Sequence, residues 1–154
     1  MRILIVEDDP ISSRLLQVIL SVYGNLSTVE NGEAAVYAFV RAWRKRKPYD
    51  LICMDIMMPK MNGIDALKHI RRIEESNGIP RNQRVKVIML TALDDTASVT
   101  EAFFEGGATA YLVKPLDRAK LLKEFENLGL LQAQNRSAPS SANDQKYPLK
   151  INPE

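Results

Sequence analysis

Short, continuously apolar runs alternate with longer segments of helical periodicity along most of the chain. The runs are rich in β-branched residues and lack polar alternation, which is typical of strands buried on both faces. We expect strands at residues 3–6, 51–54, 85–90 and 110–113, and a weaker strand at 26–29. Each run is followed by apolar residues that recur every three or four positions, which predicts an amphipathic helix. These helices are expected at 10–23, 31–46, 63–75, 96–105 and 117–128.

Glycine and proline residues mark the limits of these elements. Pro10 suits the first turn of a helix, Gly24 ends that helix, and Pro48 stops the next one. The segment 76–84 contains the turn former Gly78 together with several polar residues, so it is expected to be an exposed loop. Successive strand–helix units predict an α/β fold with a doubly wound parallel sheet and helices on both faces, because parallel strands need crossover connections.

Composition sets the class of protein. The chain has 154 residues, of which 45% are hydrophobic and 26% charged, as in an ordinary soluble globular protein. One cysteine and one histidine exclude a disulfide framework and a site built from several Cys or His ligands. No apolar run is long enough to span a bilayer, and a net charge of +2 does not favour nucleic acid. We expect a soluble, cytoplasmic protein.

The composition changes near the end of the last predicted helix. Residues 1–130 are expected to form one domain, and residues 131–154, which are rich in Gln, Asn, Ser, Ala and Pro, a flexible C-terminal tail. Docking of Tyr147, Leu149 and Ile151 onto the domain is an open alternative.

Polar residues follow four of the predicted strands. They are Glu7, Asp8 and Asp9 after the first strand, Asp55 after the third, Thr91 after the fourth and Lys114 after the fifth. In a doubly wound sheet, ligands bind outside the carboxyl ends of the strands, so these side chains are expected to meet at one edge.

Such a cluster needs a counter-charge. Two carboxylates about 4 Å apart repel by roughly 4 kcal/mol at an effective dielectric of 20. Hard carboxylate oxygens suit Mg²⁺, which also binds phosphate oxygens. Asp55 can then act as a carboxylate nucleophile toward a phosphoryl group. Thr91 offers that group a hydroxyl donor and Lys114 a cation.

These residues lie in four short motifs: VEDD at 6–9, DIMMPKMNG at 55–63, TA at 91–92 and KP at 114–115. Together they resemble the response regulator receiver domain of two-component signalling, over about residues 1–130. The resemblance implies a flavodoxin-like, five-stranded sheet of order 2-1-3-4-5. It also implies that Asp55 is the phosphoacceptor. Mg²⁺ would be held by Glu7, directly or through water, and by Asp8, Asp55 and the backbone carbonyl of Met57.

The resemblance extends to the response that phosphorylation triggers. Thr91 and Lys114 would bind the phosphoryl group, the Lys114–Pro115 bond would be cis, and Tyr111 would be the switch aromatic that turns inward with Thr91. The responsive surface would comprise Thr96–Gly106, Ala110–Val113 and Asp117–Leu128. The implied partners are a histidine kinase or histidine phosphotransfer protein and a downstream protein, with no direct contact to nucleic acid or membrane.

Two features modify the pattern. Met57 and Leu93 are apolar at positions that flank the route of the attacking water in this family, so neither can orient that water by a good hydrogen bond. We therefore expect slow self-dephosphorylation. The segment 76–84 is longer than usual but lies away from the phosphorylation edge.

Several residues also admit simpler interpretations. Asp9 is a candidate helix cap, His69 a surface residue and Cys53 a small core residue. Tyr111 could be a half-buried strand tyrosine that never moves. The basic run 41–47 is expected to be a solvated helix end. Docking of an acidic partner stays an alternative because further basic residues could extend this run. They are Arg71, Arg72, Arg81, Arg84 and Lys86.

The functional hypotheses differ in class. The first is a stand-alone phosphorylatable signalling switch without its own catalytic turnover beyond slow self-dephosphorylation; its variant is the same switch as one domain of a longer regulator or hybrid kinase. The second is a magnesium-dependent phosphohydrolase, which would want an acid two residues after its nucleophile, where this chain has Met57. The third, a scaffold with an inactive site, is disfavoured because every expected reactive residue is present.

Overall fold

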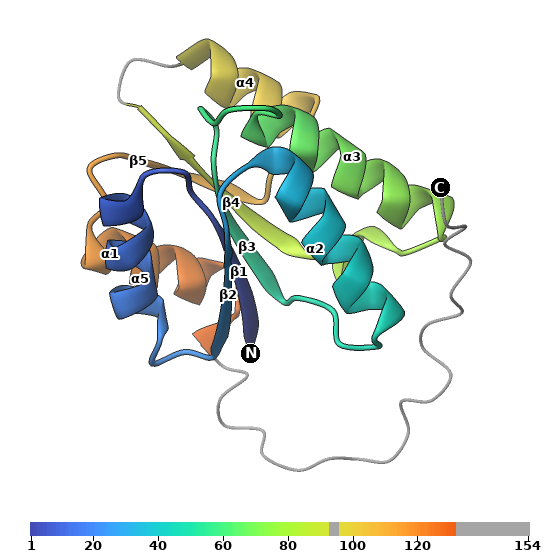
Figure 1. The fold of residues 1–154 in the computed structure, drawn as a ribbon, viewed down its shortest axis with the longest axis horizontal. Coiled ribbons are helices and arrows are strands. Elements are labelled where there is room, and N and C mark those ends of the chain that lie inside the picture. The colour runs from blue at the N-terminus through green and yellow to red at the C-terminus, as the bar shows by residue number, and fades with distance from the viewer. Residues whose placement is uncertain (93–95, 132–154) are drawn as a thin grey trace.

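A five-stranded parallel sheet forms the centre of the molecule (Figure 1). The computed structural model describes residues 1–92 and 96–131. The strand order is β2-β1-β3-β4-β5, which confirms the predicted doubly wound topology. The strands are β1 (Arg2–Val6), β2 (Asn25–Val29), β3 (Leu51–Asp55), β4 (Lys86–Thr91) and β5 (Ala110–Val113).

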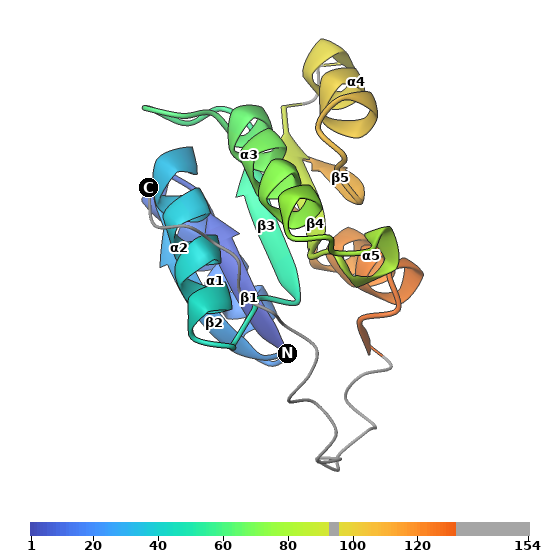
Figure 2. The ribbon, with the colours of Figure 1, turned by 90° about the vertical axis from the view of Figure 1, so that its right-hand side faces the viewer.

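Helices cover both faces of the sheet. They are α1 (Pro10–Leu20), α2 (Gly32–Arg44), α3 (Gly63–Ser76), the short 3₁₀ helix η1 (Arg81–Gln83), α4 (Thr96–Phe104) and α5 (Arg118–Asn127). Figure 1 shows α1 and α5 together on one face and α2 and α3 on the other. In Figure 2, α4 lies beyond α3, beside the β4–β5 end of the sheet.

Two apolar cores lie on opposite faces because side chains alternate along each strand. In β3, Ile52 and Met54 point into the core beneath α2 and α3, and Leu51 and Cys53 into the core beneath α1 and α5. All four side chains are fully buried. The continuously apolar β3 is therefore a strand buried on both faces, whereas the edge strands β2 and β5 keep partly exposed residues. Cys53 is a core residue, as predicted.

Side-chain caps fix where four helices begin. Asp9, Asn31, Asn62 and Asp117 each accept a hydrogen bond from a backbone N–H in the first turn of α1, α2, α3 and α5. Such caps satisfy donors that have no partner within the helix. The capping role predicted for Asp9 is confirmed.

The predicted limits need small corrections. The helix predicted over 10–23 ends at Leu20, and the chain then turns so that the Asn25 N–H bonds to the Met1 carbonyl. The helix predicted to reach residue 46 ends at Arg44, and Arg46 takes a left-handed φ of 55°. The segment 76–84 is not wholly irregular, because it contains η1.

The apolar residues of α1 fall on two sides of the helix. Leu16 and Ile19 are buried, whereas Ile11 and Val18 are 80% and 59% exposed. His69 on α3 is exposed, as expected for a surface histidine. None of the helices formed by the described residues has the length and apolar character needed to span a bilayer. The predicted tail lies outside the described residues, except for Leu131.

Candidate functional site

The carboxyl ends of four strands place the predicted polar residues along one edge of the sheet. Asp55 is the last residue of β3, and Thr91 is the last of β4. Glu7 follows β1 directly, and Lys114 follows β5. The Glu7 N–H bonds to the Val29 carbonyl, and the Lys114 N–H bonds to the Thr91 carbonyl. Backbone pairing therefore continues up to the residues that carry the chemistry.

Lys114 joins the two buried carboxylates of this edge. Its Nζ lies 2.8 Å from Oε2 of Glu7 and 3.2 Å from Oδ2 of Asp55. Glu7 is 2% and Asp55 6% exposed. Asp8 is exposed, and carboxylate oxygens of Glu7, Asp8 and Asp55 lie within 4.8 Å of one another. The structure thus brings Glu7, Asp8, Asp55 and Lys114 together.

The negative charges of the cluster exceed the single positive charge of Lys114. Burial raises the pKa of Glu7, as does the charge of Asp55, while hydrogen bonds from Lys114 and the Asp9 N–H lower it. Desolvation acts to lower the pKa of Lys114, but the hydrogen bond to Glu7 and the charges of Asp55 and Glu7 raise it overall. The ammonium is therefore held charged, yet a single cation does not offset all the negative charge around Glu7.

These carboxylates fit a divalent cation. Three carboxylates facing one ammonium leave a formal excess of negative charge, and their hard oxygens are the ligands that Mg²⁺ prefers. The exposed Asp8 leaves one side of the cluster open to solvent, and Mg²⁺ usually keeps several water ligands. The donor set and its charge thus agree with the magnesium site predicted from the sequence.

Gly63 allows the start of α3 to approach Asp55 closely. The Gly63 N–H bonds to the Ile56 carbonyl over 2.9 Å, which closes the loop after β3. A Cβ at Gly63 would lie 2.1 Å from the carbonyl oxygen of Asp55. Gly63 is the last residue of the motif at 55–63, and no role was predicted for it. Its spacing from Asp55 is the signal that could have revealed the contact.

The side chains of Thr91 and Tyr111 contact partners other than the carboxylates of the cluster. The Thr91 hydroxyl is buried and donates to the Ala92 carbonyl over 3.3 Å. The Tyr111 side chain is 42% exposed, and its ring packs edge-on against Phe103 of α4 with centroids 5.4 Å apart. Phe103 was missed by sequence analysis, because a helical pattern does not show which strand residue a helix contacts.

Of the two apolar residues that flank the expected route of the attacking water, the structure describes Met57 only. The Met57 side chain is 70% exposed beside the site. Leu93 lies outside the described residues. The Lys114–Pro115 peptide bond is cis, as expected.

Comparisons with known proteins agree with this arrangement. The family model described as the response regulator receiver domain matches residues 3–126. The chemotaxis protein CheY of Thermotoga maritima is 34% identical over 129 residues, which cover 82% of this chain and 96% of CheY. Several other curated relatives are longer proteins, and this chain spans between 8% and 49% of their lengths.

Solved structures share the fold. The receiver domain of Saccharomyces cerevisiae Ssk1, crystallised with the histidine phosphotransfer protein Ypd1, has a TM-score of 0.73 and 30% identity, covering 86% of this chain and 91% of that one. The receiver domain of the Pseudomonas aeruginosa sensor histidine kinase PA1611, with a magnesium ion in its active site cleft, has a TM-score of 0.66 and 31% identity, covering 82% and 95%.

The topology, the acidic cluster with its bridging lysine and the family match over most of the chain lead to one conclusion. This protein belongs to the response regulator receiver domain family of two-component signalling.

Proposed function

We propose that the protein is a signalling switch that accepts a phosphoryl group on Asp55. The observation that carries this proposal is the contact of Lys114 Nζ with both Glu7 and Asp55, at 2.8 and 3.2 Å. It places a cation beside the carboxylate that would attack and next to the acids that would hold a metal ion. A phosphoryl group on Asp55 would meet this positive charge directly.

Mg²⁺ would be held by Glu7, Asp8, Asp55 and the backbone carbonyl of Met57. Binding of the magnesium ion in the active site cleft of the PA1611 receiver supports this assignment. When bound, Mg²⁺ neutralises charge on the oxygens of the transferred group. Glu7 and Asp8 would supply ligand oxygens, and the buried Glu7 carboxylate has an oxygen within 4.8 Å of one of Asp55.

In the transfer step, a carboxylate oxygen of Asp55 forms a bond to phosphorus as the bond from phosphorus to the donor nitrogen breaks. The electron pair of that bond goes to the imidazole nitrogen of the donor histidine. Lys114 then pairs with a phosphoryl oxygen, and the Thr91 hydroxyl leaves the Ala92 carbonyl to donate to another. The chain contributes positioning and charge stabilisation.

The proposed donor is a histidine kinase or a histidine phosphotransfer protein in the cytoplasm. The complex of the Ssk1 receiver with Ypd1 supports this class of partner. The proposed output is a protein contact on α4, β5 and α5, changed when Thr91 and Tyr111 shift. Tyr111 and Phe103 pack together at this surface, so movement of one ring would disturb the other.

We further propose that the phosphorylated state is long-lived and that the protein has no hydrolase turnover. The exposed Met57 side chain next to Asp55 offers no hydrogen-bonding group or acid–base catalyst for water. Residues 1–130 are proposed to form the receiver domain, and residues 132–154 lie outside the described part of the chain.

Transfer of labelled phosphate from acetyl phosphate in the presence of Mg²⁺ tests the proposal. We expect one phosphate per chain in the wild type and none in Asp55→Ala. The matched control is Asp65→Ala, which removes an exposed aspartate in the first turn of α3. Equal incorporation in wild type and Asp55→Ala would refute the role of Asp55, and continuous release of phosphate would indicate a hydrolase.

A further inference from the structure

A basic cavity of about 730 Å³ opens at the end of the sheet opposite the candidate site. It lies between the C-terminal half of α3, the start of β4 and the loop from α4 to β5. Two acidic residues, Glu75 and Glu105, line it alongside a larger set of cations. The basic residues are Lys68, Arg71, Arg72, Arg81, Arg84 and Lys86.

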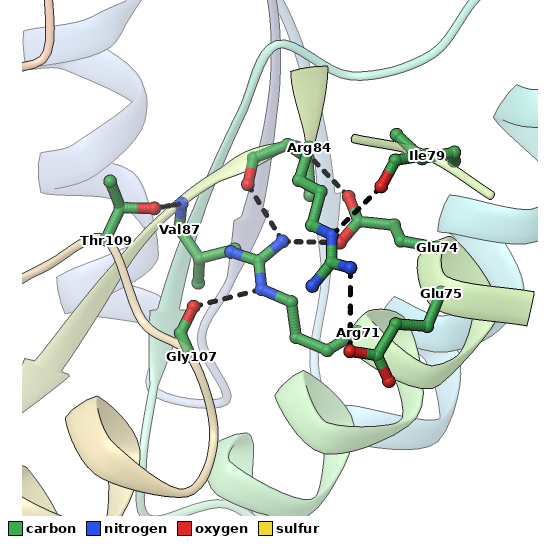
Figure 3. Close-up of polar contacts among 9 residues, drawn as sticks. Arg71, Glu74, Glu75, Ile79, Arg84, Val87, Gly107 and Thr109 are labelled. Atoms are coloured by element: carbon green, nitrogen blue, oxygen red, sulfur yellow. Dashed lines mark hydrogen bonds and ion pairs between the residues drawn. The ribbon is translucent and has the colours of Figure 1, made fainter. Parts of the chain in front are cut away.

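Arg71 is held rigidly at the wall of this cavity (Figure 3). Its Nε donates to the Gly107 carbonyl over 2.9 Å, and its Nη1 donates to the Val85 carbonyl over 3.0 Å. The same Nη1 lies 2.6 Å from Oε2 of Glu74, whose other oxygen accepts the Val85 N–H over 2.8 Å. These bonds tie α3 to β4 and to the loop before β5.

Glu74 explains why a cation is built into this wall. Its side chain is fully buried, and burial raises its pKa even though the charge and hydrogen bond of Arg71 lower it. Removing either partner would leave a buried charge unpaired. Arg71 is therefore a structural residue of the cavity wall, and its positive charge is already paired with the Glu74 carboxylate.

The remaining cations divide into paired and unpaired groups. Lys68 pairs with Glu101 at 2.7 Å, and Arg84 lies 3.5 Å from Glu75 and donates from Nε to the Ile79 carbonyl. Within the described part of the chain, three more cations have no ion pair or hydrogen bond from their side chains. They are Arg72, Arg81 and Lys86.

This surplus is local. The whole sequence carries a net charge of only +2, so three unpaired cations around one hollow concentrate positive potential there. The basic run at 41–47, at the end of α2 and in the turn after it, does not contribute, because none of its residues lines this cavity. The basic residues that the sequence left without a role thus gather at a concave site.

We propose that the basic cavity binds a small molecule carrying two or more linked phosphate groups. Four of its six cations are arginines, whose planar guanidinium groups match phosphate oxygens in pairs. Its volume falls in the range of small-molecule sites, and its concave shape favours a compact ligand. Phe103, which is 37% exposed at the rim, offers an aromatic surface to a nucleotide base.

Calorimetric titration of the full chain without Mg²⁺ tests the proposal. The probes are pyrophosphate, adenosine and guanosine diphosphate, adenosine monophosphate and adenosine. We expect the diphosphates to bind, the monophosphate to bind about tenfold more weakly or worse, and affinity to fall as salt is added. Tighter binding of a nucleoside diphosphate than of pyrophosphate identifies a nucleotide as the ligand, and equal binding identifies an inorganic polyphosphate.

A matched pair of triple variants locates the site. Arg72→Gln with Arg81→Gln and Lys86→Gln should weaken binding at least about tenfold, because it removes the charge-assisted hydrogen bonds. Arg41→Gln with Arg44→Gln and Lys47→Gln removes the same charge from the end of α2 and the turn that follows it, and should leave affinity unchanged. In the wild type, the amide resonances of Gly107 and Thr109 should shift on titration.

Three results would overturn the proposal. The first is no binding of any diphosphate at millimolar concentration. The second is equal loss of affinity in the two triple variants. The third is binding of an acidic peptide or an oligonucleotide, lost in the cavity variant, by a chain that binds no small phosphate compound. The test is independent of phosphorylation, so it stands or falls separately from the role of Asp55.

Discussion

Lys114 and Glu7 form an ion pair of 2.8 Å between the ends of β5 and β1, 107 positions apart in the sequence. The Glu7 side chain is fully buried and the Lys114 side chain is 28% exposed. The same ammonium lies 3.2 Å from Asp55, so one cation holds two carboxylates together across the sheet edge. A buried carboxylate pair without this cation would repel by several kcal/mol.

Replacement of this cation tests the charge balance of the site. Without Mg²⁺, Lys114→Gln should lower the free energy of unfolding by roughly 1–3 kcal/mol, because Glu7 and Asp55 lose their common partner. Mg²⁺ should then stabilise the variant more than the wild type, since the cluster is more negative. Thermal unfolding with and without Mg²⁺ measures both effects.

Lys120→Gln is the control for this experiment, because Lys120 is exposed on α5 and, among the described residues, makes no ion pair with the carboxylates of the cluster. Its response to Mg²⁺ should match that of the wild type. An equal or smaller Mg²⁺ effect in Lys114→Gln would show that Lys114 does not offset the charge of the metal-binding acids.

Gly63 and Gly78 are glycines for two different physical reasons, which alanine substitutions can distinguish. Gly63→Ala places a Cβ 2.1 Å from the Asp55 carbonyl, so the backbone beside Asp55 must move. Gly78 has a φ of +68° with open space around it, so Gly78→Ala costs only backbone strain. We expect a loss of roughly 1–3 kcal/mol for Gly63→Ala and about 1 kcal/mol for Gly78→Ala.

Phosphorylation distinguishes the two variants further. Gly63→Ala should slow phosphoryl incorporation from acetyl phosphate, and Gly78→Ala should leave it unchanged. Wild-type incorporation in a folded Gly63→Ala would show that the approach of α3 to Asp55 does not matter to the site.

Met57 controls dephosphorylation in this account. Met57→Asn introduces an amide that can orient water beside Asp55, and one good hydrogen bond of this kind speeds the step about tenfold. Met57→Leu, which adds no polar group, should leave the rate unchanged. Decay of the labelled protein after removal of the donor gives both rates. If Met57→Asn decays as slowly as Met57→Leu, the prediction fails.

Cys53 gives a test of core integrity that depends on pH. Burial raises the pKa of its thiol to about 12, and only the thiolate is nucleophilic. Since the folded protein holds the thiol protonated as pH rises from 7 to 10, iodoacetamide should not label it over this range. Labelling should appear only with denaturant. Labelling of native protein that increases between pH 7 and 10 would contradict the buried position of Cys53.

The sequence predicted the sheet because β3 and its neighbours are continuously apolar, a pattern that only a doubly covered strand tolerates. It predicted the association of Glu7, Asp55 and Lys114 because the carboxyl ends of parallel strands share one edge. Both predictions follow from the succession of strands and helices along the chain, whereas the strand order came from the family resemblance.

The hydrophobic and polar pattern of the sequence could not predict which side chains contact one another between different elements. Arg71 and Glu74 are three positions apart, yet their roles come from Val85 and Gly107 on other elements. The outward position of Tyr111 depends on Phe103 in the same way. A helical pattern also predicts an apolar stripe on α1 without showing that Val18 would remain exposed.

Chemical trapping of the phosphorylated residue tests the central claim most directly. Borohydride reduction converts an aspartyl phosphate to homoserine, and peptide mass spectrometry then locates it. After reaction with acetyl phosphate and Mg²⁺, the account predicts homoserine at position 55 and at no other aspartate. Homoserine at Asp8 or Asp9, with Asp55 unmodified, would contradict it.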